Sequence, residues 1–120
     1  MRDTIKKHED FHTSDTDPIA RSVYFFVRAK RAKYPENPRV GFMATKRTFK
    51  LATDRNRAKR LLRDWVRYYS NKMLDKYDYI FIAREPILRA NREDGRYAMA
   101  LSLDFIAKKR PRPKNVKKTD

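Results

Sequence analysis

The sequence predicts one domain of the mixed α/β class, and three observations support this prediction. Residues 21–30 alternate as in a half-buried strand, residues 53–73 have the apolar spacing of a helix, and residues 77–83 are bulky and apolar almost throughout. The chain has 120 residues, which suffice for one ordinary domain, and we expect it to span residues 1–109. Residues 110–120 contain five cations and two prolines, so we expect a flexible basic tail there.

The first half of the chain predicts a short helix followed by two strands. The polar residues before the Asp17-Pro18 break leave room only for a short helix. In residues 21–30 the side chains that suit a core are Val23, Phe25, Val27 and Ala29. The alternate set, which suits an anionic partner with flat rings, comprises Tyr24, Phe26, Arg28 and Lys30. Two prolines in residues 34–38 predict a turn before a second strand at residues 39–47, so we expect these strands to be antiparallel neighbours.

A long helix is predicted in the second half of the chain. In residues 53–73 the stripe that should face the core comprises Ala58, Leu61, Leu62, Trp65 and Tyr69. Thr53 or Asp54 can cap this helix by accepting from its free backbone N–H groups. The helix should end near Asn71.

The remaining elements are a buried strand and a closing helix. Residues 77–83 are typical of a strand that is buried on both faces, and Pro86 ends it. The mixed three- and four-residue spacing of apolar side chains in residues 96–109 favours a closing helix.

Composition narrows the class of function. Lys and Arg number 31 and Asp and Glu number 15, so the net charge is +16 and nucleic acid is the expected partner. The absence of cysteine excludes disulfides, thiolate zinc sites and a cysteine nucleophile. No apolar run approaches the roughly 18 residues of a membrane span, and the N-terminus lacks the apolar stretch of a signal peptide. We therefore expect a cytoplasmic protein without membrane contact.

The predicted long helix has a strongly basic side. On a helical wheel, five polar side chains fall within roughly 100° of arc opposite the apolar stripe, and they are Asn56, Lys59, Arg60, Arg63 and Arg67. Like charges three and four residues apart repel, so the stability of the helix does not explain them. An ordinary solvated face mixes Glu with Lys, whereas arginine forks suit phosphate oxygens. This side therefore predicts a surface that binds an anionic partner such as nucleic acid.

The run RNRAKRLLR at residues 55–63 resembles the RNR motif of the bacterial ribonuclease P protein subunit. Its surroundings resemble that family too, namely KKHEDF at 6–11, VYFFV at 23–27, RVGFMATKR at 39–47 and YDYIFIAR at 77–84. The resemblance implies an α+β two-layer sandwich in which helices pack on a mixed sheet of about four strands, in the order α-β-β-β-α-β-α. It also implies a left-handed βαβ crossover, and it places the fourth strand near residues 19–22.

The resemblance also implies the function of a ribonuclease P subunit, which supports endonucleolytic removal of the 5′ leader from precursor tRNA. In this family the RNA subunit performs the Mg²⁺-dependent chemistry, so we expect no catalytic residue or metal site in the protein and one protein for each RNA. The residues implied to bind that RNA are Arg55, Asn56, Arg57, Lys59, Arg60 and Arg63. The candidates for holding the leader are Phe11, Tyr24, Phe26, Arg28, Lys46 and Arg67.

Other interpretations of the sequence are weaker. A small basic ribosomal or RNA-assembly protein would have a similar composition, while a DNA-binding helix lacks a helix-turn-helix partner. His8 and His12 have the four-residue spacing of metal ligands, but no third ligand accompanies them. Asp10, Asp15 and Asp17 could hold Mg²⁺ through water, although such clusters are more often solvated or cap helices.

Overall fold

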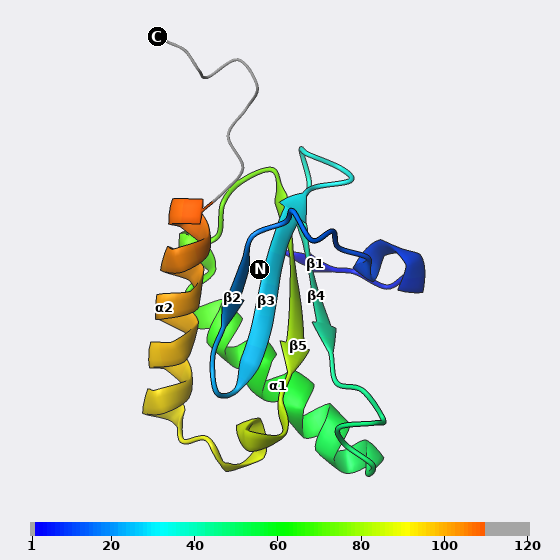
Figure 1. The fold of residues 1–120 in the computed structure, drawn as a ribbon, viewed down its shortest axis with the longest axis vertical. Coiled ribbons are helices and arrows are strands. Elements are labelled where there is room, and N and C mark those ends of the chain that lie inside the picture. The colour runs from blue at the N-terminus through cyan, green and yellow to red at the C-terminus, as the bar shows by residue number, and fades with distance from the viewer. Residues whose placement is uncertain (1, 110–120) are drawn as a thin grey trace, which may run out of the picture.

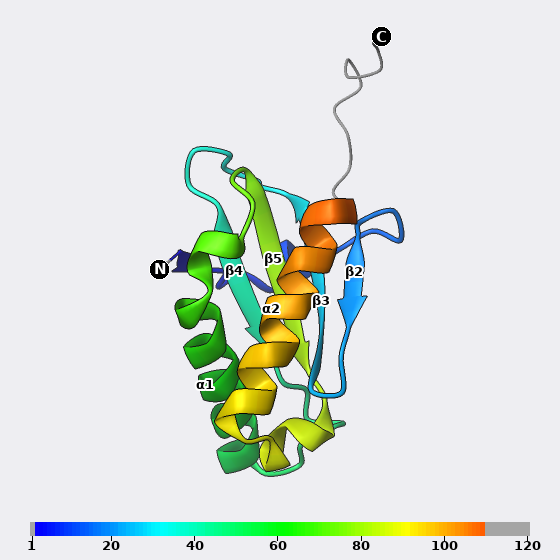
Figure 2. The ribbon, with the colours of Figure 1, turned by 90° about the vertical axis from the view of Figure 1, so that its left-hand side faces the viewer.

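A five-stranded mixed sheet with two long helices on one of its faces forms the protein (Figures 1 and 2). The structure is a computed structural model that describes residues 2–109, so the predicted basic tail lies outside the described residues. The strands are β1 (Asp3–Thr4), β2 (Ile19–Arg21), β3 (Phe25–Arg31), β4 (Arg39–Met43) and β5 (Tyr77–Ala83). The helices are α1 (Ala52–Tyr68) and α2 (Arg92–Lys109), with single 3₁₀ turns η1 (His8–Phe11), η2 (Ser70–Lys72) and η3 (Glu85–Arg89).

The order of the strands contradicts the predicted hairpin. The sheet runs β1-β4-β5-β3-β2, so β5 separates β3 from β4, pairing antiparallel with β3 and parallel with β4. The proline-containing segment 32–38 is therefore not a hairpin turn, because it must cross the end of β5 over roughly 10 Å, two strand spacings. Backbone N–H groups near both ends of this segment, those of Lys33 and Arg39, donate to the carboxylate of Asp78 on β5 at 3.4 and 2.7 Å.

The connection from β4 through α1 to β5 is a left-handed crossover. In Figure 1 the arrows of β4 and β5 both point down, β5 lies to the left of β4, and α1 passes behind the sheet. This hand is the opposite of the one that most parallel crossovers adopt. It agrees with the expectation that the family resemblance raised.

The N-terminal region differs in part from the prediction. Instead of the expected helix, residues 2–18 form only the single 3₁₀ turn η1 as a helical element, and it lies on the side of the sheet away from α1 and α2 (Figures 1 and 2). The strand expected near residues 19–22 is confirmed as β2, which pairs antiparallel with β3. The two-residue β1, which pairs parallel with β4, has no signature in the sequence because it is too short for a periodic pattern.

Helix α1 buries the predicted stripe. Ala58, Leu62 and Trp65 are inaccessible to solvent, and Leu61 and Tyr69 are half-buried against the same core. The predicted capping is wrong, since the extended residue before the helix is Leu51 and no side chain caps the first turn. The helix ends at Tyr68, before the predicted Asn71. No helix in residues 2–109 is long and apolar enough to cross a bilayer.

The two helices meet where Trp65 of α1 lies against Gly95 of α2. A Cβ atom built on Gly95 would fall far inside van der Waals contact of the six-membered ring of the Trp65 indole. Trp65 also contacts the ring of Phe25 on β3, with ring centroids 6.4 Å apart. Gly95 therefore allows the close approach of α2 that buries the indole.

We expect Gly95→Ala to destabilise the fold by about 1–3 kcal/mol, the usual range for an overpacked core. At a freely exposed position in a helix the same change stabilises by up to about 1 kcal/mol. Destabilisation by Gly95→Ala would therefore indicate that the position is tightly packed. Urea unfolding would measure the change. In the double variant with Trp65→Phe, the smaller ring should recover part of the Gly95→Ala loss, and a stabilised Gly95→Ala single variant would contradict this packing.

Candidate nucleic-acid interface

The cations of α1 lie on its outer side, as the helical wheel predicts. Asn56, Arg57, Arg60 and Arg67 are exposed, whereas Lys59 and Arg63 are half-buried. We call these six residues the basic face. The guanidinium of Arg63 lies over the ring of Phe42, 5.3 Å from its centroid, so this side chain is held near the end of β4. The basic face therefore combines freely exposed cations with anchored ones.

Arg55, predicted to bind RNA, is turned back toward the loop before the helix. Its Nη1 donates to the carbonyl oxygens of Phe49 at 2.8 Å and Lys50 at 3.2 Å. The side chain is half-buried, and Phe49 itself is buried. Arg55 therefore holds the β4–α1 loop against the first turn of α1, which is a structural task that its place in the motif does not indicate.

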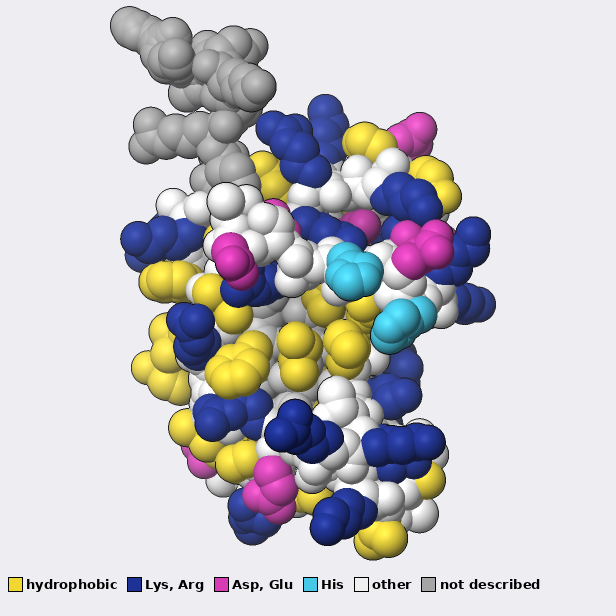
Figure 3. All heavy atoms as spheres, turned by 45° about the vertical axis from the view of Figure 1, so that its right-hand side comes forward, with side chains coloured by type: hydrophobic (Ala, Val, Ile, Leu, Met, Phe, Trp, Pro, Cys, Tyr) yellow, Lys and Arg dark blue, Asp and Glu magenta, His cyan; other side chains and the backbone are white. Residues whose placement is uncertain are grey.

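The face of the sheet opposite the helices is open and has an apolar centre. Strand register aligns Phe26 of β3 with Ile82 of β5, and Ile82 with Met43 of β4. All three side chains are half-buried, because neither long helix covers this face. Figure 3 shows a band of hydrophobic side chains on this side of the molecule, with cations above and below it. We call this side the open face.

Tyr24 does not lie on the open face, contrary to the prediction from alternation. Its ring packs against Trp65 with centroids 6.1 Å apart, on the helix side of the sheet. The reason is the turn before β3, in which the Ser22 hydroxyl accepts the backbone N–H groups of Tyr24 and Phe25 at 3.2 and 3.1 Å. The strand begins only at Phe25, so the alternation of side chains does not extend back to Tyr24.

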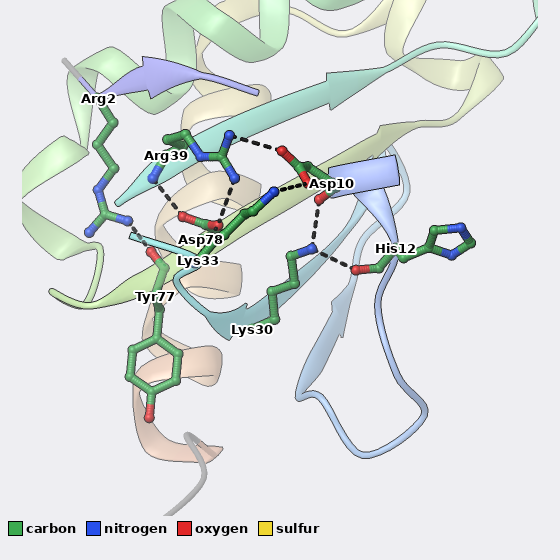
Figure 4. Close-up of polar contacts among 8 residues, drawn as sticks. All are labelled: Arg2, Asp10, His12, Lys30, Lys33, Arg39, Tyr77 and Asp78. Atoms are coloured by element: carbon green, nitrogen blue, oxygen red, sulfur yellow. Dashed lines mark hydrogen bonds and ion pairs between the residues drawn. The ribbon is translucent and has the colours of Figure 1, made fainter. Parts of the chain in front are cut away.

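Arg28 and Lys30 lie on the open face and hold the N-terminal segment across it. Arg28 Nη1 donates to the carbonyl oxygens of Ser14 and Asp17, the latter at 3.2 Å. Lys30 Nζ donates to the carbonyl oxygens of Asp10 at 2.6 Å and His12 at 2.7 Å (Figure 4). Both cations thus fix residues 10–17, and their charge is still displayed on this side because both side chains are half-exposed.

Phe11 packs on the sheet where β4 has no side chain. A Cβ atom on Gly41 would lie 2.5 Å from Phe11 Cε1, so the glycine lets the ring lie on the strand. Phe11 also lines a cavity of about 430 Å³ that has Lys59 and Arg63 on its other wall. This cavity connects the open face with the basic face.

The two remaining leader candidates lie away from Phe26. Lys46 is exposed in the loop between β4 and α1, and Arg67 is exposed in the last turn of α1, in the helical layer across the sheet. The structure therefore brings Phe11, Phe26 and Arg28 to one side of the sheet and leaves Tyr24 and Arg67 on the other.

Arg84 belongs to the open face, although the sequence analysis does not select it. It follows β5 directly, and its guanidinium lies over the ring of Phe26 at 4.9 Å from the centroid. Its Nη1 also donates to the carbonyl oxygen of Ser22 at 2.9 Å. The only indication of this role that the sequence gives is that Arg84 follows a buried strand, because residues at strand ends lie at the edge of the sheet surface.

A network of charges fastens η1 to the sheet (Figure 4). The nearly buried carboxylate of Asp10 accepts hydrogen bonds from Lys33 and Arg39, both at 3.2 Å. Arg39 also lies 3.6 Å from the carboxylate of the fully buried Asp78 and 5.1 Å from the centroid of the Tyr34 ring. Because Phe11 follows Asp10, this network sets the position of the ring next to the cavity.

The pKa of Asp10 is lowered. Desolvation by burial raises this pKa, but the hydrogen bonds from Lys33 and Arg39 and their positive charges outweigh that effect. An aspartate whose pKa is lower in the folded than in the unfolded chain stabilises the fold above its unfolded pKa, and this contribution is lost as the pH falls through the folded pKa. Ionised Asp10 therefore stabilises the attachment of η1 at neutral pH, and this stabilisation is lost in acid.

We expect η1 to detach as the pH falls below about 4, the ordinary pKa of aspartate. The ring protons of Phe11 and the amide of Gly41 would report the release in NMR spectra, since the two residues are in contact. In Asp10→Asn the acid step should disappear, because the amide does not titrate. An unchanged pH profile in this variant would show that another group controls η1.

His8 and His12 flank Phe11, and with Phe11 and Met43 they line a small cavity of about 130 Å³. Within residues 2–109, no three side chains of His, Cys, Asp or Glu come together in a group that could hold a metal ion. The two histidines lie beside Phe11 at the rim of the open face.

Comparisons with known proteins agree on one family. The family model described as Ribonuclease P matches residues 2–105. The ribonuclease P protein component of Marinomonas sp. is 34% identical over 95 residues, which cover 79% of this chain and 71% of that protein. That of Brucella suis is 42% identical over 95 residues, which cover 72% of this chain and 67% of that protein.

Solved structures show the same architecture. The Staphylococcus aureus RNase P protein superposes with a TM-score of 0.71 at 26% identity, covering 90% of this chain and 97% of that one. The RNase P protein from Thermotoga maritima has a TM-score of 0.59 at 21% identity, covering 71% and 79%, and supports the fold alone.

Proposed function

Because the chain belongs to the ribonuclease P protein family, we propose that it binds the RNA subunit of ribonuclease P through the basic face and holds the 5′ leader of precursor tRNA on the open face. Family membership makes it a protein component of an endoribonuclease. The observation that supports the two surfaces is their separation, since the cations of α1 and the apolar centre with Phe26 lie on opposite layers of the sandwich.

The basic face suits a phosphate backbone more than the edges of bases. Arg57 and Arg60 are exposed and have no partner among the described residues, so their guanidinium groups are free to pair with phosphate oxygens. Lys59 and Arg63 are half-buried at the cavity shared with Phe11 and therefore offer fixed rather than mobile charges. Such contacts position an RNA without reading its sequence.

The open face suits an unpaired strand. Phe26 and Phe11 offer rings for stacking, and Arg28, Lys30 and Arg84 offer charge for the backbone between the bases. Because Arg84 already covers the Phe26 ring, a base would stack on the guanidinium or displace it. The cavity of about 430 Å³ would lead such a strand from the open face to the basic face.

Magnesium belongs to the RNA in this proposal. Residues 2–109 contain no group of three His, Cys, Asp or Glu side chains that could hold a metal ion, and the proposal assigns no step to a metal held by the protein. The +16 charge would reduce repulsion between the RNA subunit and its substrate, which lowers the Mg²⁺ concentration that the two RNAs need.

Reconstitution tests the function directly. The full chain mixed with a bacterial ribonuclease P RNA should restore cleavage of precursor tRNA at the mature 5′ end in low Mg²⁺, where the RNA alone is slow. Sedimentation of the same mixture should give one protein for each RNA. If the protein binds structured RNAs equally well but never restores cleavage, the alternative of an RNA-assembly protein would be preferred.

Phe26→Ala should weaken binding of precursor tRNA to the holoenzyme about fivefold, near the lower end of the range for loss of one stacked base, because Arg84 already covers one side of the ring. Mature tRNA, which has no leader, should bind unchanged. Phe105→Ala is the matched control, because Phe105 is a partly exposed phenylalanine on α2. An equal loss for both tRNAs would place Phe26 in the core of the fold instead.

A further inference from the structure

Helix α2 has apolar side chains on two sides, and only one of them is covered. Met99, Leu103 and Ile106 are buried against the sheet. On the other side Tyr97, Leu101 and Phe105 follow one another at four-residue intervals and are 67%, 52% and 45% exposed. A helix that is apolar on both sides is normally buried on both, so this stripe indicates a partner.

The stripe borders a groove between α2 and β2. Two adjoining cavities of about 340 and 350 Å³ lie along it, and both are lined by Arg21, Leu101 and Ser102. Phe105 lies at one end of the groove, and Tyr97 lies at the other end beside Val23, which is 60% exposed. The groove is therefore long and apolar on the helix side, with the cation Arg21 at its middle and the carboxylate of Asp94 in the cavity at the Tyr97 end.

The strand side of the groove is a free edge of the sheet. β2 is the last strand in the order, so one of its edges has no neighbouring strand. On its other edge, Pro18 O accepts from Ala29 N–H and Ser22 N–H donates to Phe25 O, and in the register between β2 and β3 such hydrogen-bonded positions alternate with positions that are not hydrogen-bonded. In an antiparallel pair, the residues between such hydrogen-bonded positions point their backbone groups to the other side. The N–H and C=O groups of Ile19 and Arg21 therefore point away from β3 and have no partner within residues 2–109.

We propose that this groove binds an extended acidic peptide segment of a partner protein, which adds to the sheet as a strand beside β2. An added strand would use the free backbone groups of Ile19 and Arg21, and its alternate apolar side chains would lie on Leu101 and Phe105. Acidic residues fit because Arg21 lines both cavities, the carboxylate of Asp94 lines only the one at the Tyr97 end, and the chain carries +16. A second copy of the chain would carry the same positive charge and be repelled. An RNA strand lacks the alternating backbone donors and acceptors that are needed to pair with the edge of β2.

A synthetic peptide tests this proposal with the full chain. The probe is fluorescein-labelled acetyl-Glu-Val-Glu-Leu-Glu-Val-Glu-amide, and fluorescence anisotropy measures its binding. The same peptide with N-methyl groups on alternate residues, which cannot form the ladder, should bind at least about tenfold more weakly, equivalent to about 1.4 kcal/mol. Equal affinity of the two peptides would overturn the strand addition.

Variants of the protein locate the site. Leu101→Ser should weaken binding of the peptide about 5- to 30-fold, the range for an anchoring side chain, whereas Leu51→Ser, at a leucine that is at least as exposed, should not. Arg21→Glu should weaken the glutamate peptide about tenfold and favour a lysine version of it, and this exchange cannot arise from misfolding. Cleavage of precursor tRNA should be unchanged in Leu101→Ser.

Two further outcomes would overturn the proposal in favour of another occupant. If oligouridine displaces the peptide in competition, the groove is an RNA surface. If the free chain sediments as a dimer that Leu101→Ser dissociates, a second copy covers the stripe.

Discussion

The double variant Arg57→Glu with Arg60→Glu should bind ribonuclease P RNA more weakly than the unchanged protein does. This loss of affinity should be about 25- to 60-fold larger in 0.1 M salt than in 1 M salt. Each phosphate contact contributes about 0.7–0.9 to the slope of log affinity against log salt, so the loss of two contacts reduces the slope by about 1.4–1.8 over that decade. The fold should persist, because both side chains are exposed on the side of α1 away from the buried stripe. Filter binding over a salt series measures the slope, and circular dichroism confirms the helix content.

A control with the same change in net charge separates local contacts from long-range attraction. Arg92 and Lys108 are exposed at the two ends of α2, away from the basic face, so Arg92→Glu with Lys108→Glu removes as much charge. This pair should change the slope by much less than the α1 pair. Equal slopes for the two double variants would mean that RNA responds to the total charge of the protein and that the basic face has no special role.

Asp78→Ala should destabilise the fold by about 3–5 kcal/mol, the usual loss when one member of a buried ion pair is removed. The carboxylate is fully buried and accepts the backbone N–H of Arg39 at 2.7 Å, while the Arg39 guanidinium lies 3.6 Å away. Without it, the backbone N–H groups of Lys33 and Arg39 lose their acceptor, and the Arg39 guanidinium keeps Asp10 as its remaining counter-ion. Since domains are stable by only about 5–15 kcal/mol, the variant should be close to unfolding in urea titrations.

Asp104→Ala is the matched control for Asp78→Ala. Asp104 pairs with Lys72 at 3.2 Å, but both side chains are substantially exposed, and such pairs contribute less than about 1 kcal/mol. Asp78→Asn should lose less than Asp78→Ala, because the amide oxygen can still accept from Arg39. Similar losses for Asp78→Ala and Asp104→Ala would show that Asp78 does not bind the two ends of the crossing segment together.

The elements whose side chains follow one regular pattern of burial were predictable from the sequence. β5 is bulky and apolar because every residue of it except Ile82 is buried, and α1 has one buried stripe that the helical period reveals. The order of the strands was not predictable from local pattern. β3 and β4 are neighbours in sequence, but the strand that lies between them follows 34 residues after Met43, at Tyr77.

The candidate site was predictable only where the regular period holds. Alternation is valid for Phe26 and Arg28 inside β3, but the hydroxyl of Ser22 shapes the turn that takes Tyr24 to the other side. The helical wheel gives the correct direction of Arg60 and Arg67, yet it contains no information about the loop carbonyls that Arg55 meets. These differences come from tertiary contacts that no local pattern encodes.

The position of β5 also determines how the chain can fold while it is being made. β3 and β4 both take their central partner from a strand that ends 40 residues after Met43, at Ala83, which a ribosome needs roughly 2–8 s to synthesise. During that interval the pairing with the shortest loop closure is the hairpin of β3 with β4, which the native sheet does not contain. If that hairpin forms, β5 has to separate the two strands before it can pair with both, and this non-local pairing is expected to be a slow step in folding.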